Sequence, residues 1–138
     1  MSGPNFKRFY EYLGTLHDER FSWGVHDCLT FTNTAFKILH GRGWADDIAG
    51  QYMAEGRAMT RKELQARFGH VSFEDFMANR LRRKSSVPDR GDLVASARPE
   101  KWCAGIALGI SLGTSAVYLG RVGLQHQPIE YCKAAWMP

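Results

Sequence analysis

The sequence contains little cysteine and only a small excess of positive charge. Its 138 residues include three cysteines, Cys28, Cys103 and Cys132, and the chain opens without a basic segment followed by an apolar one. An odd count and no leader predict neither a disulfide framework nor secretion, so the thiols are expected to stay reduced, as in a cytoplasm. The 18 Lys and Arg against 14 Asp and Glu give a net charge of +4. That excess is too small to indicate a nucleic-acid-binding protein.

Several ligand-binding patterns are also missing. There is no C-x-x-C pair and no pair of histidines at helix spacing, which argues against a structural zinc site. No glycine-rich loop of the Walker or Rossmann pattern lies between a strand and a helix, so nucleotide binding is unsupported. We therefore expect no metal and no cofactor.

Charge is absent from the segment Trp102–Gly120, which is long enough to raise the question of a membrane span. Within Ala104–Gly113, however, large residues alternate strictly with glycine, alanine and serine. A period of two is typical of a strand with one apolar face and one nearly bare face. We therefore predict a buried strand whose bare face lets another element approach closely, and no membrane span.

The composition is that of one folded domain. Apolar residues make up 44% of the chain and charged residues 23%, as in ordinary globular proteins. Helical periodicity dominates about 1–84, and strand-like segments joined by short turns dominate about 90–138, which favours an antiparallel meander. The sequence thus predicts a single domain over 1–138 with an α+β fold, in which N-terminal helices pack on a C-terminal antiparallel sheet.

Two segments have weaker patterns. Residues 46–58 are expected to form a helix. The basic run Arg80–Lys84 is expected to be the solvated end of a further helix, where positive charge suits the helix dipole. A docking site for an anionic partner is the alternative interpretation of that run.

Cys28 is the strongest candidate for a reactive group. Asp27 is a good N-cap for a helix that begins at Cys28 and stops at Gly41, so the thiol is expected in the first helical turn. The unpaired N–H groups there favour a thiolate, whereas the apolar face of the same helix makes Cys28 a small buried side chain. A nucleophilic cysteine also needs a base, for which His126 and His26 are weak candidates.

Three motifs follow one another in the order of a known family. Asp27-Cys28 opens a helix, Gly91-Asp92-Leu93-Val94 opens a strand, and Ala107–Gly113 forms the next strand. This order resembles the NlpC-type family of papain-like cell-wall cysteine peptidases. The chain is more closely similar to a family from tailed phages and prophages, whose members are similar to NlpC-type proteins and are encoded among tail-tip genes. The resemblance implies a papain-like NlpC-type fold.

Position by position, the resemblance makes Cys28 the nucleophile and puts Ala107 where the family has its catalytic histidine. A methyl group cannot accept the thiol proton, so the standard Cys-His mechanism lacks its base unless a histidine elsewhere in the fold supplies it. The other matched motif positions are Asp27, Gly91, Asp92 and Gly109.

The resemblance implies two alternative functions. Both place the protein in the virion tail of a phage, and the tail is assembled in the host cytoplasm. The first is a structural or assembly role in the tail tip, with a degenerate active site and with hub, fibre or tape-measure proteins as partners. The second is an active cysteine endopeptidase that cuts peptide crosslinks of peptidoglycan during entry, with Cys28 forming a thioester and its backbone N–H stabilising the oxyanion. The first is preferred because Ala107 replaces histidine. A soluble cytoplasmic thiol protein unrelated to phages is a third alternative, outside this resemblance.

Overall fold

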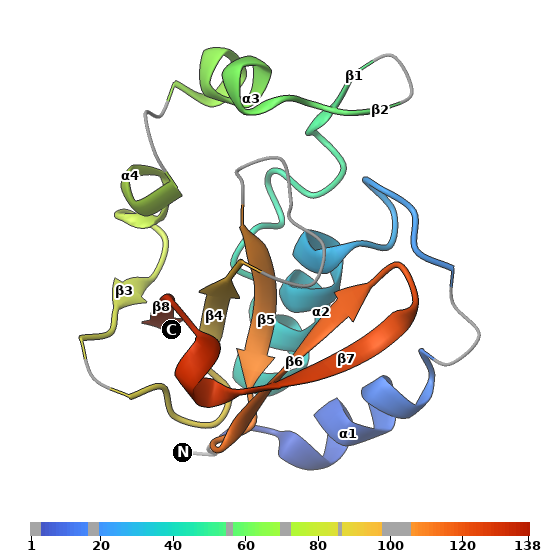
Figure 1. The fold of residues 1–138 in the computed structure, drawn as a ribbon, viewed down its shortest axis with the longest axis vertical. Coiled ribbons are helices and arrows are strands. Elements are labelled where there is room, and N and C mark those ends of the chain that lie inside the picture. The colour runs from blue at the N-terminus through green and yellow to red at the C-terminus, as the bar shows by residue number, and fades with distance from the viewer. Residues whose placement is uncertain (1–3, 17–19, 55–56, 70–72, 86, 98–105) are drawn as a thin grey trace.

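The computed structural model describes residues 4–16, 20–54, 57–69, 73–85, 87–97 and 106–138. In these ranges the chain confirms the α+β class, with the α-helices in its first part and one large sheet in its second (Figure 1). The helices are α1 (Phe6–Gly14), α2 (Cys28–His40), α3 (Arg61–Phe68), α4 (Phe73–Met77) and the 3₁₀ helix η1 (Ile129–Tyr131). The strands are β1 (Met53–Ala54), β2 (Arg57–Ala58), β3 (Arg82–Arg83), β4 (Leu93–Ser96), β5 (Ala107–Ser111), β6 (Ser115–Gly120), β7 (Gly123–Pro128) and β8 (Ala134–Met137).

The large sheet is antiparallel and departs from a simple meander at its last strand. Its order is β3-β8-β4-β5-β6-β7. Strands β5, β6 and β7 follow one another through short turns, as predicted. After η1, however, the chain returns across the sheet, and β8 pairs with the side of β4 that faces away from β5 (Figure 1). The Lys133 N–H, which donates to the Ala95 carbonyl at 2.8 Å, holds this return.

The alternating segment of the sequence supplies β5, whose two faces pack differently. Leu108 and Ile110 belong to the main core with α2, whereas Ala107 belongs to a second cluster on the other face. A Cβ added to Gly109 would lie 2.6 Å from the ring of Tyr118, so the neighbouring strand covers the bare face closely. The buried strand is therefore confirmed over Ala107–Ser111, whereas the chain leaves the strand at Leu112 and residues 104–105 lie outside the described residues. No helix in the described ranges is long and apolar enough to cross a membrane.

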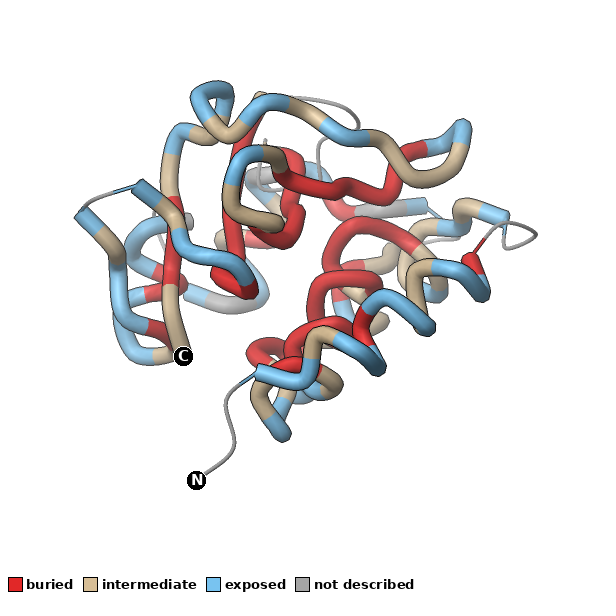
Figure 2. The backbone as a smooth tube through the Cα atoms, turned by 90° about the horizontal axis from the view of Figure 1, so that it is seen from below, coloured by how far each residue is buried: buried red, intermediate tan, exposed pale blue. Residues whose placement is uncertain are grey.

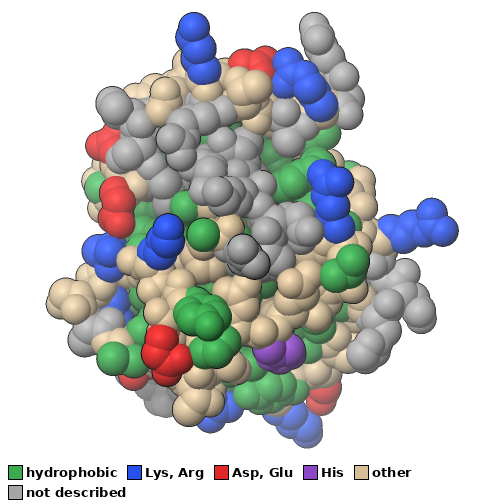
Figure 3. Space-filling model, viewed as in Figure 1, with side chains coloured by type: hydrophobic (Ala, Val, Ile, Leu, Met, Phe, Trp, Pro, Cys, Tyr) green, Lys and Arg blue, Asp and Glu red, His purple; other side chains and the backbone are tan. Residues whose placement is uncertain are grey.

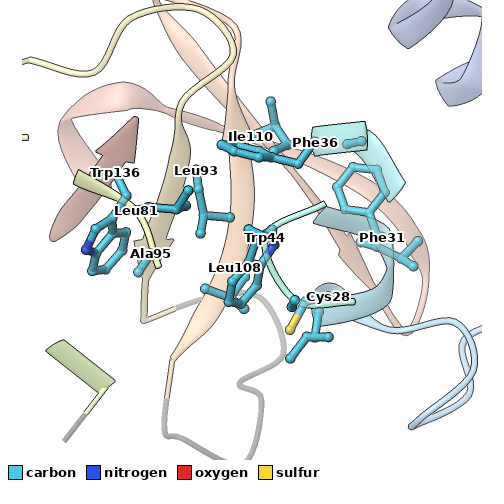
Figure 4. Packing of buried hydrophobic residues seen from close by; sticks show 14 of the residues in the cluster. Cys28, Phe31, Phe36, Trp44, Leu81, Leu93, Ala95, Leu108, Ile110 and Trp136 are labelled. Atoms are coloured by element: carbon cyan, nitrogen blue, oxygen red, sulfur yellow. The ribbon is translucent and has the colours of Figure 1, made fainter. Parts of the chain in front are cut away.

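The main core lies between the helices and one face of the sheet. α2 runs behind the central strands in Figure 1, and α1 packs beside it through the fully buried Phe9. Figure 4 shows Phe36 of α2 beside Ile110 of β5. In Figure 2 the buried residues gather in the interior and the exposed ones lie along the outside. Removal of these apolar side chains from water is the main favourable term in folding.

The described part of the segment 46–58, residues 46–54 and 57–58, does not form the predicted helix. The chain makes a series of turns and then the two-stranded hairpin β1–β2. Gly50 has a φ of +78°, a left-handed conformation that interrupts helical propagation. Tyr52 is completely buried. The tertiary packing of Tyr52 therefore outweighs the weak helical periodicity of this segment.

The basic run after α4 is not a helix end, so this prediction is also wrong. α4 ends at Met77, and Arg82 and Arg83 form the edge strand β3, which pairs with β8. Arg83 forms an ion pair with Glu74 at 3.0 Å, and Arg82 donates to the carbonyl of Pro138 at 2.9 Å. The run is therefore a short, charged sheet edge, a form that discourages further strand pairing.

Candidate functional site

The start of α2 is held by the carboxylate of Asp27, the residue that the sequence predicts as its N-cap. Oδ1 accepts hydrogen bonds from the N–H groups of Leu29 at 2.9 Å and Thr30 at 3.0 Å, and Thr30 Oγ1 accepts from the Asp27 N–H in return. Oδ2 accepts from the Gly24 N–H at 2.6 Å and from the hydroxyl of Tyr52. Asp27 is completely buried. Both of its oxygens are therefore engaged in holding the loop, the helix and the buried tyrosine together.

Cys28 is the first residue of α2, and its side chain belongs to the main core. It is 1% exposed and does not form a disulfide. In Figure 4 its sulfur lies on the side of Trp44 and Leu108, which belong to the same buried cluster. A helix start favours a thiolate, but an apolar enclosure favours the neutral thiol. Of the two interpretations that the sequence leaves open, this burial favours the small packed side chain.

The two candidate bases lie in different surroundings. His26 precedes the cap, and its Nε2 is buried with no hydrogen-bond partner within the described residues. His126 is exposed on β7 and lines a surface pocket of about 560 Å³ together with Ser96 and Tyr131, but Cys28 does not line that pocket. The described part of the chain has no group of three or more His, Cys, Asp and Glu that could hold a metal ion. His126 thus faces solvent at a sheet edge, whereas Cys28 is enclosed.

Ala107, at the position where the resembled family has its histidine, lies on the opposite face of the sheet from α2. Its side chain packs with Ala116 and Tyr118 in the second cluster, whereas the next residue, Leu108, packs in the cluster that contains Cys28. Successive strand residues point to opposite faces. A histidine at position 107 would therefore point away from the Cys28 thiol.

The Gly91-Asp92 motif lies at the other end of α2 from Cys28. His40, the last residue of the helix, donates through Nε2 to the Gly91 carbonyl at 2.8 Å. The 13 residues of α2 separate its two ends by on the order of 20 Å. The buried Asp92 carboxylate lies 3.3 Å from the ammonium group of Lys84. This motif shapes the turn before β4, and the fold does not bring it to the thiol.

A polar cluster that the sequence analysis missed lies on the outer face of the sheet. The Tyr118 hydroxyl is 3.4 Å from Cys132 Sγ, and Ser96 also hydrogen-bonds Tyr118. Burial, and then the contact with Cys132, raise the pKa of Tyr118. Burial also raises the pKa of the Cys132 thiol, although the bond from Tyr118 acts in the opposite direction. No sequence pattern signals this cluster, because only the return of the chain through η1 places Cys132 over β6.

We expect alkylation of Cys132 to be slow at neutral pH, because its raised pKa reduces the thiolate fraction. The rate should therefore continue to increase above the pKa of about 8.5 that is typical of a free cysteine. Tyr118→Phe removes the bond that lowers the pKa of Cys132, so alkylation at a given pH should slow roughly two- to fivefold. Peptide mass spectrometry measures the rate, with unchanged thermal unfolding as the control. Faster alkylation in the folded variant would contradict this role of Tyr118.

The comparisons with known proteins identify one family. A family model described as "Domain of unknown function (DUF6950)" matches residues 4–137. The match spans every helix and strand described above, from α1 to β8. Neither a curated protein nor a solved structure matches the chain.

Proposed function

We propose that this chain, which belongs to the DUF6950 family, is a structural or assembly component of a phage tail tip on an NlpC-type papain-like scaffold without a working active site. The family description names no activity, so the proposal rests on the order of the three motifs and on the surroundings of Cys28. A helix that begins at Asp27-Cys28 and packs on an antiparallel sheet is compatible with that scaffold. Because such a likeness supports a fold better than an activity, the site itself must decide between the two alternative functions.

The enclosure of the Cys28 thiol is the observation that carries the proposal. A cysteine nucleophile must reach the carbonyl carbon of its substrate, whereas Cys28 is 1% exposed. The adjacent carboxylate of Asp27 already accepts from Gly24, Leu29, Thr30 and Tyr52. This carboxylate is therefore part of the frame of the fold, and it is not available to orient a catalytic base.

The missing base points to the same conclusion. Ala107 cannot take a proton from the thiol, and its side chain lies on the far face of the sheet. Ala107→His should therefore fail to activate Cys28, in contrast to a site that has merely lost its histidine. On this view the papain-like order of elements has been kept as a scaffold, and its catalytic constellation is absent.

Tail-tip hub, fibre or tape-measure proteins are the partners that we propose, with assembly in the host cytoplasm and a final place in the virion tail. Five large hydrophobic side chains are exposed in the described part of the chain, and we propose three of them as contacts for such partners. These three are Val25 in the loop before α2, Val122 at the β6–β7 turn and Tyr131 in η1. Aromatic and apolar residues of this kind are common at the centres of protein interfaces.

We expect Cys28 in the native protein to alkylate more slowly than Cys132, by roughly 100-fold or more, because Cys28 becomes accessible only when the structure opens. Peptide mass spectrometry can follow both thiols in the same sample over a range of pH, and denaturant should make their rates similar. A fast, saturating rate at Cys28 with an apparent pKa well below about 8.5 would contradict the proposal. In the phage that encodes the chain, Cys28→Ala should also assemble infectious particles as well as the native sequence does.

The second candidate function is a peptidoglycan endopeptidase with Cys28 as its nucleophile. One observation favours it, because the buried Nε2 of His26 has no partner within the described residues and lies two residues from Cys28 in the chain. If His26 activates the thiol, His26→Ala should abolish a low apparent pKa of Cys28 in the alkylation experiment. If Cys28 remains protected in both proteins, His26 is a packed side chain and the assembly function stands.

A further inference from the structure

We propose that the edge strand β7 pairs with β7 of a second copy of the chain and so joins two sheets across a two-fold axis. β7 is the last strand of its sheet. Among the described residues, no backbone hydrogen bond from any segment outside the β6 ladder reaches Gly123–Pro128. A strand edge with unpaired N–H and C=O groups is a template for strand addition. This inference does not depend on the proposed function.

The two edges of the sheet differ in the features that control such pairing. β3, at one edge, has two residues, Arg82 and Arg83, and both are charged and engaged with neighbouring groups. β7, at the other edge, has the six residues GLQHQP and none of them is Lys, Arg, Asp or Glu. Figure 3 shows hydrophobic, histidine and uncharged side chains along this part of the surface. Proteins commonly protect an edge with charge, so β7 is the edge left open to a partner.

The β6–β7 turn determines which backbone groups of β7 point outward. Two residues, Arg121 and Val122, join the closing pair Gly120 and Gly123. In such a hairpin the closing pair exchanges hydrogen bonds, and the pairs then alternate along the ladder. Leu124 and His126 therefore direct their N–H and C=O groups away from β6. The next outward position is occupied by a proline, which has no N–H and so ends the available edge.

A two-fold axis at Gln125 gives hydrogen-bond partners to the outward N–H and C=O groups of both Leu124 and His126. In this register Leu124 of one copy lies opposite His126 of the second copy, and each such pair exchanges two N–H···O bonds. Gln125 lies opposite its own counterpart, and Pro128 falls beyond the paired stretch. The strand is therefore complementary to itself, which is the requirement for a closed dimer.

The charges in and beside β7 are also compatible with β7 of a second copy as the pairing strand. The strand itself is uncharged, so antiparallel pairing places no like charges opposite each other. The nearest flanking charges are Arg121 before the strand and Glu130 after it. Antiparallel pairing brings the Arg121 end of one copy to the Glu130 end of the other. Opposite charges thus meet at both ends of the interface.

A disulfide across the two-fold axis tests this register. Directly opposite residues in a pair without mutual hydrogen bonds have Cα atoms about 4.5 Å apart, within the range that a disulfide bridges. Gln125→Cys should therefore form a disulfide-linked dimer on mild oxidation, with a 125–125 linkage found by peptide mass spectrometry. Gln127→Cys is the matched control, because Gln127 is on the same strand and is similarly half-buried. In the proposed register the Cα atoms of the two residues at 127 are about 14 Å apart, too far to form a disulfide.

The unmodified chain should show a reversible increase from one to two chain masses with concentration in sedimentation equilibrium. Gln125→Lys should shift it to the monomer, because two like charges then face each other at the axis, whereas Gln125→Ser should not. A monomer at all concentrations up to about 1 mM would overturn the proposal. A dimer that persists in Gln125→Lys, with equal disulfide yields from Gln125→Cys and Gln127→Cys, would also overturn the proposal. Its interface would then lie elsewhere on the molecule. A β7 that pairs only with an extended segment of another protein would likewise leave the unmodified chain monomeric.

Discussion

Replacement of Asp27 by alanine is expected to lower the free energy of unfolding by about 3 kcal/mol, from the loss of an N-cap and of buried hydrogen-bond partners. The carboxylate caps α2 through Leu29 and Thr30, and it also satisfies the Gly24 N–H and the Tyr52 hydroxyl. In the alanine variant these donors remain in or near the core without their acceptor. Urea unfolding measures the effect, which is a large fraction of the stability of an ordinary domain.

Two further variants separate the cap from the buried bond. Tyr52→Phe removes only the hydroxyl and should cost about 1–2 kcal/mol. Asp27→Asn keeps an oxygen acceptor for the N–H groups of Leu29 and Thr30 but loses the oxygen that accepts from the Gly24 N–H. The loss in free energy of unfolding should therefore lie between those of Tyr52→Phe and Asp27→Ala. Asp27→Ala should cost less in the Tyr52→Phe background, by about 1 kcal/mol, if the two side chains are coupled. Strictly additive losses would show that the Asp27–Tyr52 bond does not contribute to stability.

Gly109→Ala should lower the free energy of unfolding by about 2–3 kcal/mol, because it overpacks the space between β5 and β6. The new Cβ would lie 2.6 Å from the Tyr118 ring and 2.6 Å from the carbonyl oxygen of Val117. The carbonyl belongs to the paired neighbouring strand, so it cannot move aside without disturbing the β5–β6 ladder. The same urea titration measures the loss, and near-UV circular dichroism should show a changed environment of Tyr118.

Gly14→Ala is the matched control for this substitution. Gly14 ends α1, and a Cβ there would meet no atom within 4 Å. Alanine in a helix also restricts the unfolded chain, so the expected change is between zero and a gain of about 1 kcal/mol. Equal effects at Gly14 and Gly109 would contradict the close contact between Gly109 and Tyr118.

Local sequence patterns predict the secondary structure correctly where residues close together in the chain determine the conformation. The Asp27 cap and the start of α2 at Cys28 follow from capping chemistry, and the end of α2 follows from Gly41, whose φ is +84°. The alternation in Ala104–Gly113 likewise identified a buried strand instead of a membrane helix, within the residues that the structure describes. In each case a side chain two to four residues away, or the period of the chain itself, provides the decisive interaction.

The same patterns were insufficient where distant residues compete with local preference. The weak periodicity of residues 46–58 predicts a helix, but in the described part of this segment Tyr52 is buried against Asp27 and Met53–Ala54 form a strand. The basic run joined the sheet as β3 because β8, more than 50 residues later, offers it backbone partners. The sequence of each segment alone does not show its distant partner, which is Asp27 for Tyr52 and β8 for β3.

The candidate site depends on both levels. Composition, capping and the order of motifs suffice to choose an α+β domain and to select Cys28, because these features require only short-range chemistry and hydrophobic periodicity. The packing of α2 on the sheet then decides that the thiol is enclosed, that Ala107 faces the other side and that Gly91-Asp92 lies at the far end of the helix. Spatial proximity between residues tens of positions apart arises only when the layers close on one another, and a one-dimensional pattern carries no measure of it.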